Sequence, residues 1–397
     1  MSQHDVAIVG GGPSGLYAAR LLAKSGLDVV LFEKKPFIGK DIVCTGIVNG
    51  EIFREYDISR DSQTGVMQTV RMVGPKEEAV FYHHPSPFAV IVDRVAFDLD
   101  LASQAAAAGA EVMAGTEVSD LSVDTEGVRL RTASPASSPK EWKARMAVLA
   151  TGCHHRLHDK AGLEPPRKSL HGAQVEIPAP DEADTSIFLG KSYVRGGFGW
   201  SVPSLPGKMK VGLITREAPL PAFRKFAAAR FPGAAGEDSL RSPGIKPISQ
   251  GMAAKSVADR ILALGEAAGQ VKTTTGGGIA YGLLGARFAA EAILEGYHRG
   301  RFDTAALSAY ERRWKTVLGR EITVGFWAWK VFAWMSESQI SSLFDIAKSD
   351  GVFPMIQRRG DFDWQSGLIL DLLRKTSVFD YVKGLSSKPA FLDRLLN

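Results

Sequence analysis

The chain has 397 residues, of which 45% are hydrophobic and 23% are charged. This composition excludes a disordered or collagen-like chain, and at about 150 residues per domain the length suggests two to three domains. The formal net charge of +5 suits a phosphate-bearing ligand, an anionic lipid surface or nucleic acid, without choosing among them. Glycine is the informative residue, because 41 glycines are about 10% of the chain against a usual value of about 7%.

The sequence shows no targeting signal and no cysteine framework. The N-terminus lacks the pattern of a secretory signal, and no run of about 18 apolar residues predicts a membrane-spanning helix. The two cysteines, Cys44 and Cys153, are too few for a disulfide framework or a cysteine-based zinc site. We therefore expect a cytoplasmic protein without a nucleic-acid partner, and peripheral contact with a membrane stays open.

A glycine-rich turn lies between two predicted strands at the start of the chain. Residues 5–10 read as a buried strand, a helical pattern follows the turn, and a second strand ends in Glu33. The turn carries G-x-G-x-x-G, in which Gly10 permits the tight turn, Gly12 lets the backbone approach a pyrophosphate, and Gly15 allows close packing. Glu33 can accept hydrogen bonds from ribose hydroxyls. The combination predicts dinucleotide binding, and the alternative is a plain glycine turn in an α/β protein.

A second glycine cluster lies about 260 residues further along the chain. Residues 261–264 predict a buried strand that runs into Gly265 and Glu266, and Gly276–Gly278 open a long helical pattern. A helix N-terminus free of side chains leaves backbone N–H groups for a phosphate or for the edge of a flavin ring. Two such loops predict one cofactor that both of them hold.

Taken together, these motifs resemble the geranylgeranyl reductase family of FAD-dependent oxidoreductases, within the wider glutathione-reductase-like and aromatic-hydroxylase-like class. Residues 92–98 resemble the D-R-x-x-F-D segment, whose arginine, here Arg94, lies at the FAD site. Residues 147–152 resemble the strand that closes against the cofactor, and residues 265–279 match the pattern G-D-A-A-G…G-G-G-I. The likeness covers residues 1 to about 385.

Two further motifs point to this family within the class. Cys44 falls 11 residues after Glu33, where these reductases carry a cysteine beside the flavin. Residues 198–203 (FGWSVP), followed by Val211-Gly212, resemble the Y/F-x-W-x-F-P…G signature that lines the pocket for the isoprenoid chain. Residues 335–340 resemble the C-terminal helical region of the family.

The resemblance implies an α/β fold with a Rossmann-like FAD-binding domain, an antiparallel β-sheet substrate domain and a helical C-terminal region. FAD is the implied cofactor, and we expect no metal. The catalytic candidates are Cys44, Phe198 and Trp200. The residues assigned to FAD are Gly10, Gly12, Ser14, Gly15, Glu33, Lys34, Cys44, Thr45, Gly46, Arg94, Val118, Gly152, Gly265, Glu266, Gly278 and Ile279.

The chain departs from the family pattern at several positions. Glu266 replaces the usual aspartate, Thr273 replaces a loop proline, and Val202 replaces the phenylalanine of the signature. Thr151-Gly152 stands where aromatic hydroxylases carry Asp-Gly, which argues against a hydroxylase using NAD(P)H in the usual way. FAD binding stays the expectation, whereas these changes leave the substrate open.

Each catalytic candidate has a plain structural alternative. A thiol at Cys44 can line the flavin face, orient the substrate or donate a proton, and otherwise it is a small buried hydrophobe. Phe198 and Trp200 face the same side of a strand, where they form an aromatic wall of the pocket or part of a sheet core. We favour the site interpretation for all three.

The tightest histidine group does not predict a metal site. His154, His155 and His158 follow a cofactor-side strand, and a metal site would need a further carboxylate or cysteine ligand and a dry shell, for which the signal is poor. We expect them on an exposed or cofactor-adjacent loop.

A tryptophan-rich segment stands near the C-terminal end of the chain. Residues 324–335 carry three tryptophans, and Trp327, Val331 and Trp334 share one face of a helix. This face either rims a lipid entrance or a membrane surface, or it packs against the FAD domain, and the sequence favours neither.

The split cofactor loops predict interleaved domains. We expect a discontinuous FAD-binding domain from residues 1–75, 90–160 and 255–300, a substrate domain from 76–89 and 160–254, and a helical region from 300–397. The chain carries no second G-x-G-x-x-G unit, so the reductant, NAD(P)H or a ferredoxin-like carrier, is expected to visit the flavin transiently.

Our sequence-based hypothesis is a reductase that saturates C=C bonds of a polyprenyl (geranylgeranyl) chain on a lipid or diphosphate. In this hypothesis N5 of the reduced flavin delivers hydride to one alkene carbon, and a proton reaches the other. Because an unactivated alkene accepts hydride poorly, close positioning and exclusion of water must contribute much of the catalysis. The alternatives are a flavin-dependent monooxygenase or halogenase and, less favoured, a non-enzymatic flavin-binding partner protein.

Overall fold

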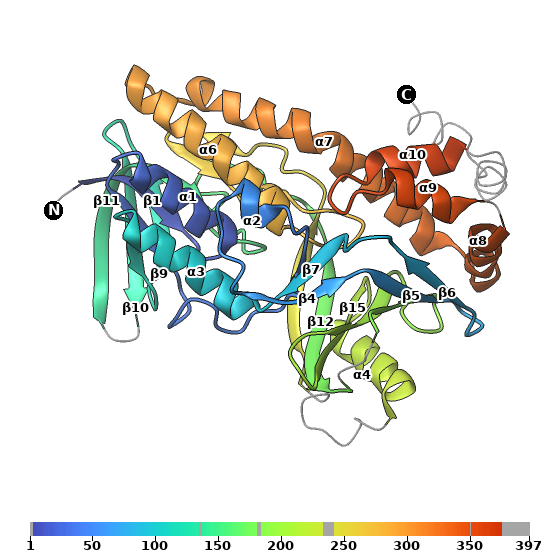
Figure 1. Ribbon diagram of the computed structural model, residues 1–397. Helices are drawn as coiled ribbons and strands as arrows, with labels where there is room; N and C mark the ends of the chain where they lie inside the picture. The colour runs from blue at the N-terminus through green and yellow to red at the C-terminus, as the bar shows by residue number, and fades with distance from the viewer. Residues whose placement is uncertain (1–2, 135–136, 181–183, 233–241, 350, 375–397) are drawn as a thin grey trace.

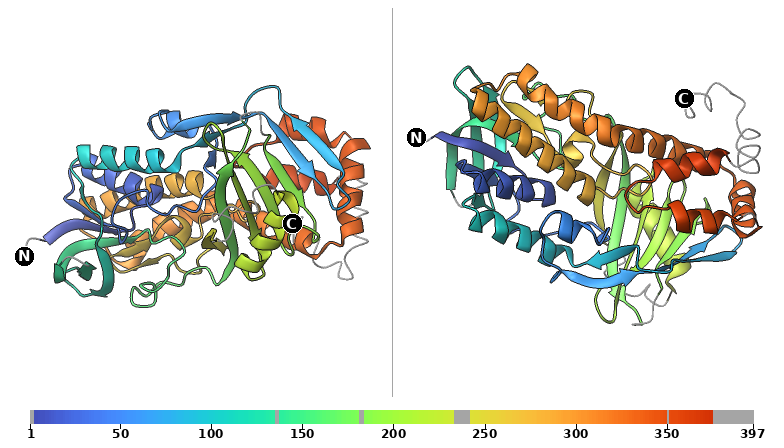
Figure 2. Two further views of the ribbon diagram at one scale, coloured as in Figure 1. Left: turned by 90° about the horizontal axis from the view of Figure 1, so that it is seen from below. Right: turned by 45° about the horizontal axis from the view of Figure 1, so that its top comes forward.

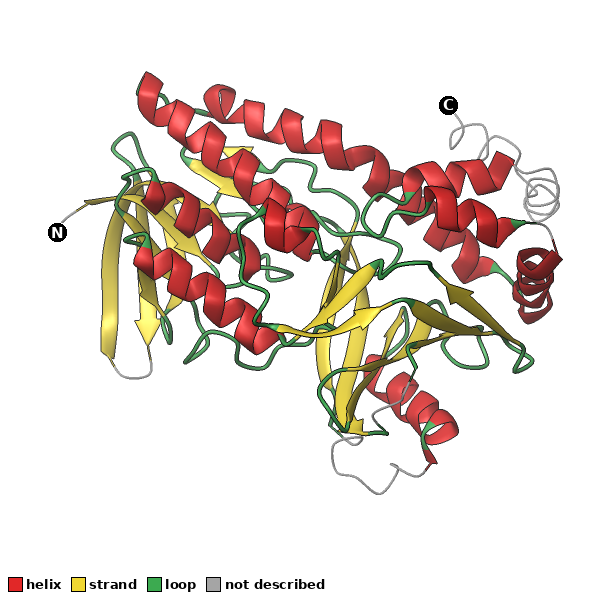
Figure 3. Cartoon of the chain, viewed as in Figure 1, coloured by secondary structure: helices red, strands yellow, loops and turns green. Residues whose placement is uncertain are grey.

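The structure is a computed structural model that describes residues 3–134, 137–180, 184–232, 242–349 and 351–374. Two β-sheets form separate layers, and a row of long helices runs beside both of them (Figure 1; Figure 3 shows the sheets in yellow). The structure has the α/β class that the sequence predicted, with a first sheet whose central strands are parallel, a mainly antiparallel second sheet and a helical C-terminal part.

The first sheet has eight strands in the order β17–β18–β11–β1–β2–β8, and the β10–β9 hairpin continues from β11. The strands are β1 (Gln3–Val9), β2 (Val29–Phe32), β8 (Glu111–Met113), β9 (Glu117–Val123), β10 (Val128–Ser134), β11 (Ser137–Leu149), β17 (Val257–Ala258) and β18 (Ile261–Ala263). Strand β1 is parallel to both β2 and β11, and β18 is parallel to β11. The part of β1 from Val6 to Val9 and all of β2 are apolar and buried, as expected of strands that are covered on both faces.

Three helices pack beside the first sheet: α1 (Pro13–Lys24), α3 (Arg94–Ala107) and α6 (Ile279–Arg299). Helix α1 begins at Pro13, whose missing N–H costs nothing at a first helical position. Helix α3 is capped by Asp93, whose carboxylate accepts hydrogen bonds from the N–H groups of Val95 and Ala96. The first residues of both helices, Pro13 and Arg94, line the cavity that is described below.

The second sheet has seven strands in the order β16–β12–β15–β14–β13–β5–β6. The strands are β5 (Thr69–Val73), β6 (Ala79–His83), β12 (Lys168–Pro178), β13 (Ser186–Leu189), β14 (Phe198–Pro203), β15 (Lys208–Thr215) and β16 (Gly244–Gln250). Its pairings are antiparallel except for that of β13 with β5, which is parallel. Helix α4 (Pro219–Arg230) covers one face of this sheet and buries Phe223 and Phe226 against it.

A small third sheet joins the two larger ones along the chain. It contains β3 (Ile47–Val48), β4 (Gln63–Met67) and β7 (Ala89–Val92) in the order β3–β7–β4, and the short helix α2 (Ile52–Glu55) follows β3. Its strands lie between α3 and the second sheet in the view of Figure 1. The loop before β3 carries Cys44, so this sheet holds that residue in place.

The C-terminal part of the chain is helical. It contains α7 (Thr304–Trp334), α8 (Glu337–Ser349), α9 (Val352–Arg359) and α10 (Ser366–Arg374). Helix α7 packs along α6 and continues toward α8, α9 and α10, as both views of Figure 2 show. Within the described ranges, no helix combines the length and the apolar character that crossing a bilayer requires.

Candidate active site

A cavity of about 1360 Å³ is lined by both large sheets and by the C-terminal helices. This volume exceeds the roughly 300–1,000 Å³ of an ordinary small-molecule site, which leaves room for a second ligand beside a dinucleotide. The predicted site residues on its wall are Gly10, Gly12, Ser14, Gly15, Glu33, Lys34, Cys44, Thr45, Gly46, Arg94, Val118, Gly152, Phe198, Trp200, Glu266, Gly278 and Ile279. Gly265 lies behind the wall, where a Cβ atom would come within 2.7 Å of the Ser14 hydroxyl oxygen.

The first glycine loop fits a dinucleotide phosphate by its shape. Gly10 has φ +119°, and a Cβ on Gly15 would lie 2.1 Å from the Gly10 carbonyl oxygen, so both positions require glycine. At Gly12 no protein atom lies within 4 Å of a Cβ position, which leaves bare backbone facing open space. The Glu33 carboxylate accepts hydrogen bonds from the N–H groups of Gly11 (2.7 Å) and Lys35 (2.9 Å), which fix its orientation at the end of β2.

The second glycine loop presents another uncapped helix N-terminus. Gly278 is the N-cap of α6 and supplies no side chain to the first-turn N–H groups of the helix. The loop is closed by two backbone hydrogen bonds between Lys272 and the glycines, from Lys272 N–H to Gly277 and from Gly276 N–H to Lys272, both 2.8 Å. Free N–H groups at the N-terminus of a helix can donate hydrogen bonds to an anion or to a carbonyl oxygen of a flavin ring. The donor set of both loops therefore fits FAD.

Cys44 lies among positive charges on the cavity wall. Burial raises the pKa of its thiol, but Arg94, a hydrogen bond from the Gly46 N–H, Lys246 and Lys210 together outweigh burial, so the net pKa lies below the ordinary value. Arg94 is itself fixed by Asp98, to which its Nη2 donates two hydrogen bonds of 3.0 Å. The environment therefore favours loss of the thiol proton.

The Cys44 loop is tied to the second sheet by two polar side chains that sequence analysis missed. Gln174 on β12 donates to the Cys44 carbonyl oxygen at 3.1 Å and accepts from the Thr45 hydroxyl at 3.2 Å. Lys210 on β15 donates to the Thr45 carbonyl oxygen at 3.1 Å. The sequence offered one sign of the role of Lys210: it is a charged residue directly before the apolar run Val211–Ile214 of the signature strand. Gln174 carries no such signal.

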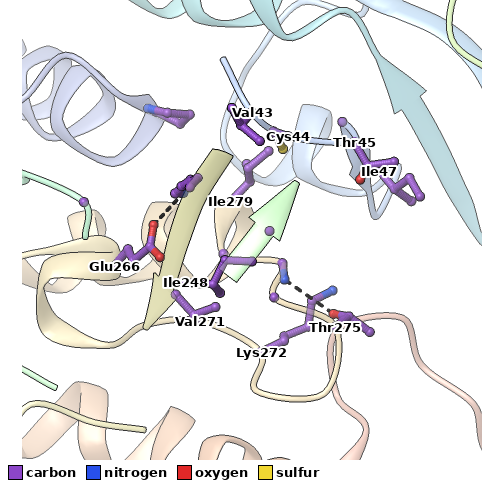
Figure 4. A pocket seen from close by; sticks show the side chains of 18 of the residues that line it. Val43, Cys44, Thr45, Ile47, Ile248, Glu266, Val271, Lys272, Thr275 and Ile279 are labelled. Atoms are coloured by element: carbon purple, nitrogen blue, oxygen red, sulfur yellow. Dashed lines mark hydrogen bonds and ion pairs between the residues drawn. The ribbon is translucent and has the colours of Figure 1, made fainter. Parts of the chain in front are cut away.

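Glu266 reaches across the cavity floor to β16. Its carboxylate forms an ion pair with Lys246 at 2.6 Å and accepts a hydrogen bond from the Ser249 N–H at 3.1 Å. Burial lowers the pKa of Lys246, but the charge of Glu266 outweighs it, and the net pKa is raised. Figure 4 shows Glu266, Val271 and Lys272 on one side of the pocket and Cys44 and Thr45 on the other. The longer glutamate thus joins the second cofactor loop to the second sheet.

One part of the cavity is apolar and aromatic. Phe198 and Trp200 on β14 line it with ring centroids 5.9 Å apart, and a Cβ on Gly212 would lie 2.4 Å from the Trp200 ring. Gly212 in the signature therefore makes room for the indole. The other apolar lining residues include Met67, Val70, Met72, Phe88, Ile187, Leu189, Val202, Ile214, Ile248, Trp329, Phe332, Leu368 and Ile369.

The C-terminal segment forms the remaining wall through buried polar contacts. Lys272 forms an ion pair of 2.8 Å with Asp363, and the two side chains are only 6% and 9% exposed. Its ammonium also lies 3.9 Å from the ring centroid of Phe362 and donates to the Phe362 carbonyl oxygen at 3.1 Å. Tyr281 of α6 donates to the Asp363 carbonyl oxygen at 2.8 Å. The second cofactor loop and the C-terminal helices are therefore fastened together.

The histidine group lies next to this site without forming a metal centre. His158 is fully buried, its Nε2 lies 3.2 Å from the Ala267 carbonyl oxygen, and burial lowers its pKa to about 4. His155 packs edge-on against it with ring centroids 4.8 Å apart. Among the residues that the structure describes, no three His, Cys, Asp or Glu side chains gather as a metal would require.

Comparison with known proteins identifies the class of enzyme. Residues 5–164 match the family model described as FAD dependent oxidoreductase. The chain is an FAD-dependent oxidoreductase. FAD is its cofactor, as the sequence predicted. The chain is 27% identical over 356 residues to digeranylgeranylglycerophospholipid reductase 2 of Methanothermobacter thermautotrophicus, an alignment that covers 86% of this chain and 91% of that one.

Solved structures show the same fold. A geranylgeranyl bacteriochlorophyll reductase-like protein from Thermoplasma acidophilum matches with a TM-score of 0.82 at 22% identity, covering 97% of this oxidoreductase and 99% of that chain. A flavin-dependent brominase matches with a TM-score of 0.72 at 17% identity, over 99% and 100% of the two chains. The resemblance to the geranylgeranyl reductase family that the motifs indicated is confirmed.

Proposed function

We propose that this oxidoreductase saturates C=C bonds of a polyprenyl chain carried by a lipid or diphosphate. One observation carries the proposal: a single cavity is lined both by glycine loops that fit FAD and by aromatic and apolar side chains beside them. Its reductase relatives, named for a digeranylgeranylglycerophospholipid, support the same chemistry.

We assign the ADP half of FAD to the first glycine loop. In this assignment the pyrophosphate lies at the N-terminus of α1 over Gly12, and the ribose hydroxyls donate to Glu33. Ser14, Lys34, Val118 and Gly152 complete the wall around this half, and the flavin half lies between the α6 N-terminus and the Cys44 loop.

The apolar region is assigned to the substrate chain. Reduced FAD supplies the hydride equivalent for the alkene, and the protein must hold the double bond in place and exclude water. Phe198 and Trp200 form a rigid aromatic wall, and Trp329 of α7 is 5% exposed on the same cavity. A cavity of this chemistry suits a hydrocarbon chain that has no polar groups to satisfy.

Cys44 is the candidate source of the proton for the second carbon. It lies on the cavity wall, and Arg94 and Lys210 lower its pKa, which makes the thiol a better acid than an ordinary cysteine. The hydrogen bonds from Gln174 and Lys210 to the loop carbonyls hold its backbone in one position. A serine at this position keeps the size but donates a proton far less readily.

The test uses protein reduced with dithionite under nitrogen and supplied with geranylgeranyl diphosphate or a geranylgeranyl lipid. We expect product masses that rise in steps of two hydrogens, and a much slower rise in the Cys44→Ser variant with FAD still bound. Absence of any mass gain on every polyprenyl substrate, with flavin bound and reduced, contradicts the proposal.

The second candidate is a flavin-dependent halogenase or monooxygenase. Residues 198–203 match the W-x-W-x-I-P pattern of halogenases only at Trp200 and Pro203, because Phe198 and Val202 replace its first tryptophan and its isoleucine. The brominase fold match adds only a shared architecture. Oxygen uptake coupled to a halogenated or hydroxylated product, with no saturation of alkenes, would favour this candidate.

A further inference from the structure

A group of positive charges lies beside the C-terminal half of α7, with one member on the helix and two at strand ends of the second sheet. Lys168 at the start of β12 and Lys330 on α7 lie over the same Phe326 ring, at 5.0 and 4.9 Å from its centroid. Their ammonium groups are therefore within about 10 Å of each other. Arg216, directly after β15, lies 4.4 Å from the ring centroid of Trp329. We call Lys168, Arg216 and Lys330 the α7 cation group.

The α7 cation group is not balanced by acidic side chains. None of its three members forms an ion pair with a carboxylate in the part of the chain that the structure describes. Burial and the charges of Lys168 and Arg216 both lower the pKa of Lys330, and no carboxylate acts against them. Like charges held together without compensation raise the free energy of the protein, and a bound anion removes that cost.

Aromatic side chains surround the same cations. Lys330 also lies 4.4 Å from the ring centroid of Trp327, and Trp334, one turn further along α7, is 65% exposed. Lys191 lies at this end too, where its ammonium donates to the Trp334 carbonyl oxygen at 3.4 Å, but the Glu337 carboxylate contacts the same loop and accepts from the Ser192 N–H at 2.7 Å. Exposed tryptophan beside lysine and arginine is the composition that favours the headgroup region of a membrane.

This surface lies directly behind one wall of the active-site cavity. Trp329, which Arg216 covers from one side, lines the cavity together with Ala328 and Phe332 of the same helix. The same short stretch of α7 thus supplies apolar cavity wall, carries Lys330 and packs its rings against Lys168 and Arg216. A lipid whose phosphate rests on the cations would have its chains close to the apolar region.

We propose that the α7 cation group and Trp334 bind the phosphate headgroups of an anionic lipid bilayer. The surface then places the cavity next to the membrane from which a polyprenyl lipid must come. The role in substrate supply rests on the function proposed above, whereas the binding itself does not, because it needs no reduced flavin and no turnover.

The test measures binding of the full-length holoprotein to vesicles by co-sedimentation. Vesicles of phosphatidylcholine are compared with vesicles that also contain phosphatidylglycerol. The test variant is Lys168→Gln/Lys330→Gln, and the matched control is Arg312→Gln/Arg320→Gln. The control also removes two positive charges, both from α7, at positions about 27 and 15 Å before Lys330 along the helix axis. Bound FAD absorbance and the melting temperature verify that both variants are folded.

We expect the wild type and the control to bind the vesicles that contain phosphatidylglycerol with similar strength, and phosphatidylcholine alone only weakly. The test variant should bind about thirty-fold more weakly, the equivalent of about 1 kcal/mol for each charge removed. Equal binding to both vesicle types, or equal losses in the test and control variants, overturns the proposal. Full displacement by inorganic phosphate or by polyglutamate, at a concentration matched to the lipid phosphate, also overturns it, since the surface would then recognise a free anion or an acidic protein.

Discussion

The buried ion pair between Lys272 and Asp363 offers a sharp test of how the cavity is built. Lys272→Met removes one charge and leaves Asp363, 9% exposed, without its partner. Breaking such a pair from one side costs about 3–5 kcal/mol, because the remaining charge is buried and uncompensated. The hydrogen bonds of Asp363 with Tyr281 and Asp361 involve its backbone C=O and N–H groups, so they do not compensate the charge of its carboxylate.

Urea unfolding of the holoprotein and limited proteolysis of residues 351–374 measure the effect. We expect Lys272→Met to lower the free energy of unfolding by about 3–5 kcal/mol and to expose the C-terminal segment to protease. The double variant Lys272→Met/Asp363→Asn should recover at least half of that loss, since no buried charge remains. Arg359→Gln, which breaks the exposed pair with Asp371, should cost only about 0–1 kcal/mol. Equal costs for Lys272→Met and Arg359→Gln, or no recovery in the double variant, would refute the reasoning.

Three further predictions concern the cofactor loop, the thiol and the buried histidine. Gly15→Ala should prevent folding or FAD binding because its Cβ would lie 2.1 Å from a carbonyl oxygen, whereas Gly12→Ala should fold normally and bind FAD more weakly in a fluorescence titration. Iodoacetamide should alkylate Cys44 at lower pH than a free cysteine, and Lys210→Met should move that pH profile upward, because it removes a cation that stabilises the thiolate; an unmoved profile contradicts the assignment. Burial lowers the pKa of His158 from 6.5 to about 4, so the side chain takes up a proton more readily in the unfolded chain than in the folded protein. Its contribution to stability is therefore complete above pH 6.5 and falls by about 3 kcal/mol in total as the pH decreases from 6.5 to 4. His158→Gln should flatten that part of the stability curve, and an unchanged curve would show that another group titrates.

The sequence predicted what depends on local chain geometry. The turn at Gly10–Gly15 and the loop at Gly276 follow from backbone conformations that only glycine readily adopts or from close approaches that only glycine allows, so residue type reveals them directly. The pairing of Phe198 with Trp200 follows from the two-residue repeat of a strand. These signals need no knowledge of distant parts of the chain.

The sequence did not predict contacts between segments that are far apart in the chain. Cys44 and Gln174 are 130 residues apart, and Lys272 and Asp363 are 91 apart. Nothing in the local pattern of either residue specifies its partner, because any polar side chain in a buried strand or loop would look the same. The α7 cation group escaped sequence analysis for the same reason, since Lys168 begins β12 and Arg216 follows β15, both far from α7 in the chain.

The central claim is that reduced flavin in this protein gives its electrons to a C=C bond. The most direct measurement mixes the dithionite-reduced holoprotein, freed of excess dithionite, with geranylgeranyl diphosphate or a geranylgeranyl lipid in an anaerobic stopped-flow instrument. Flavin reoxidation is followed by absorbance, and the product is weighed by mass spectrometry. We predict reoxidation without oxygen, with one double bond saturated for each flavin oxidised. Flavin that stays reduced with every polyprenyl substrate and reoxidises only when oxygen is admitted would contradict the claim.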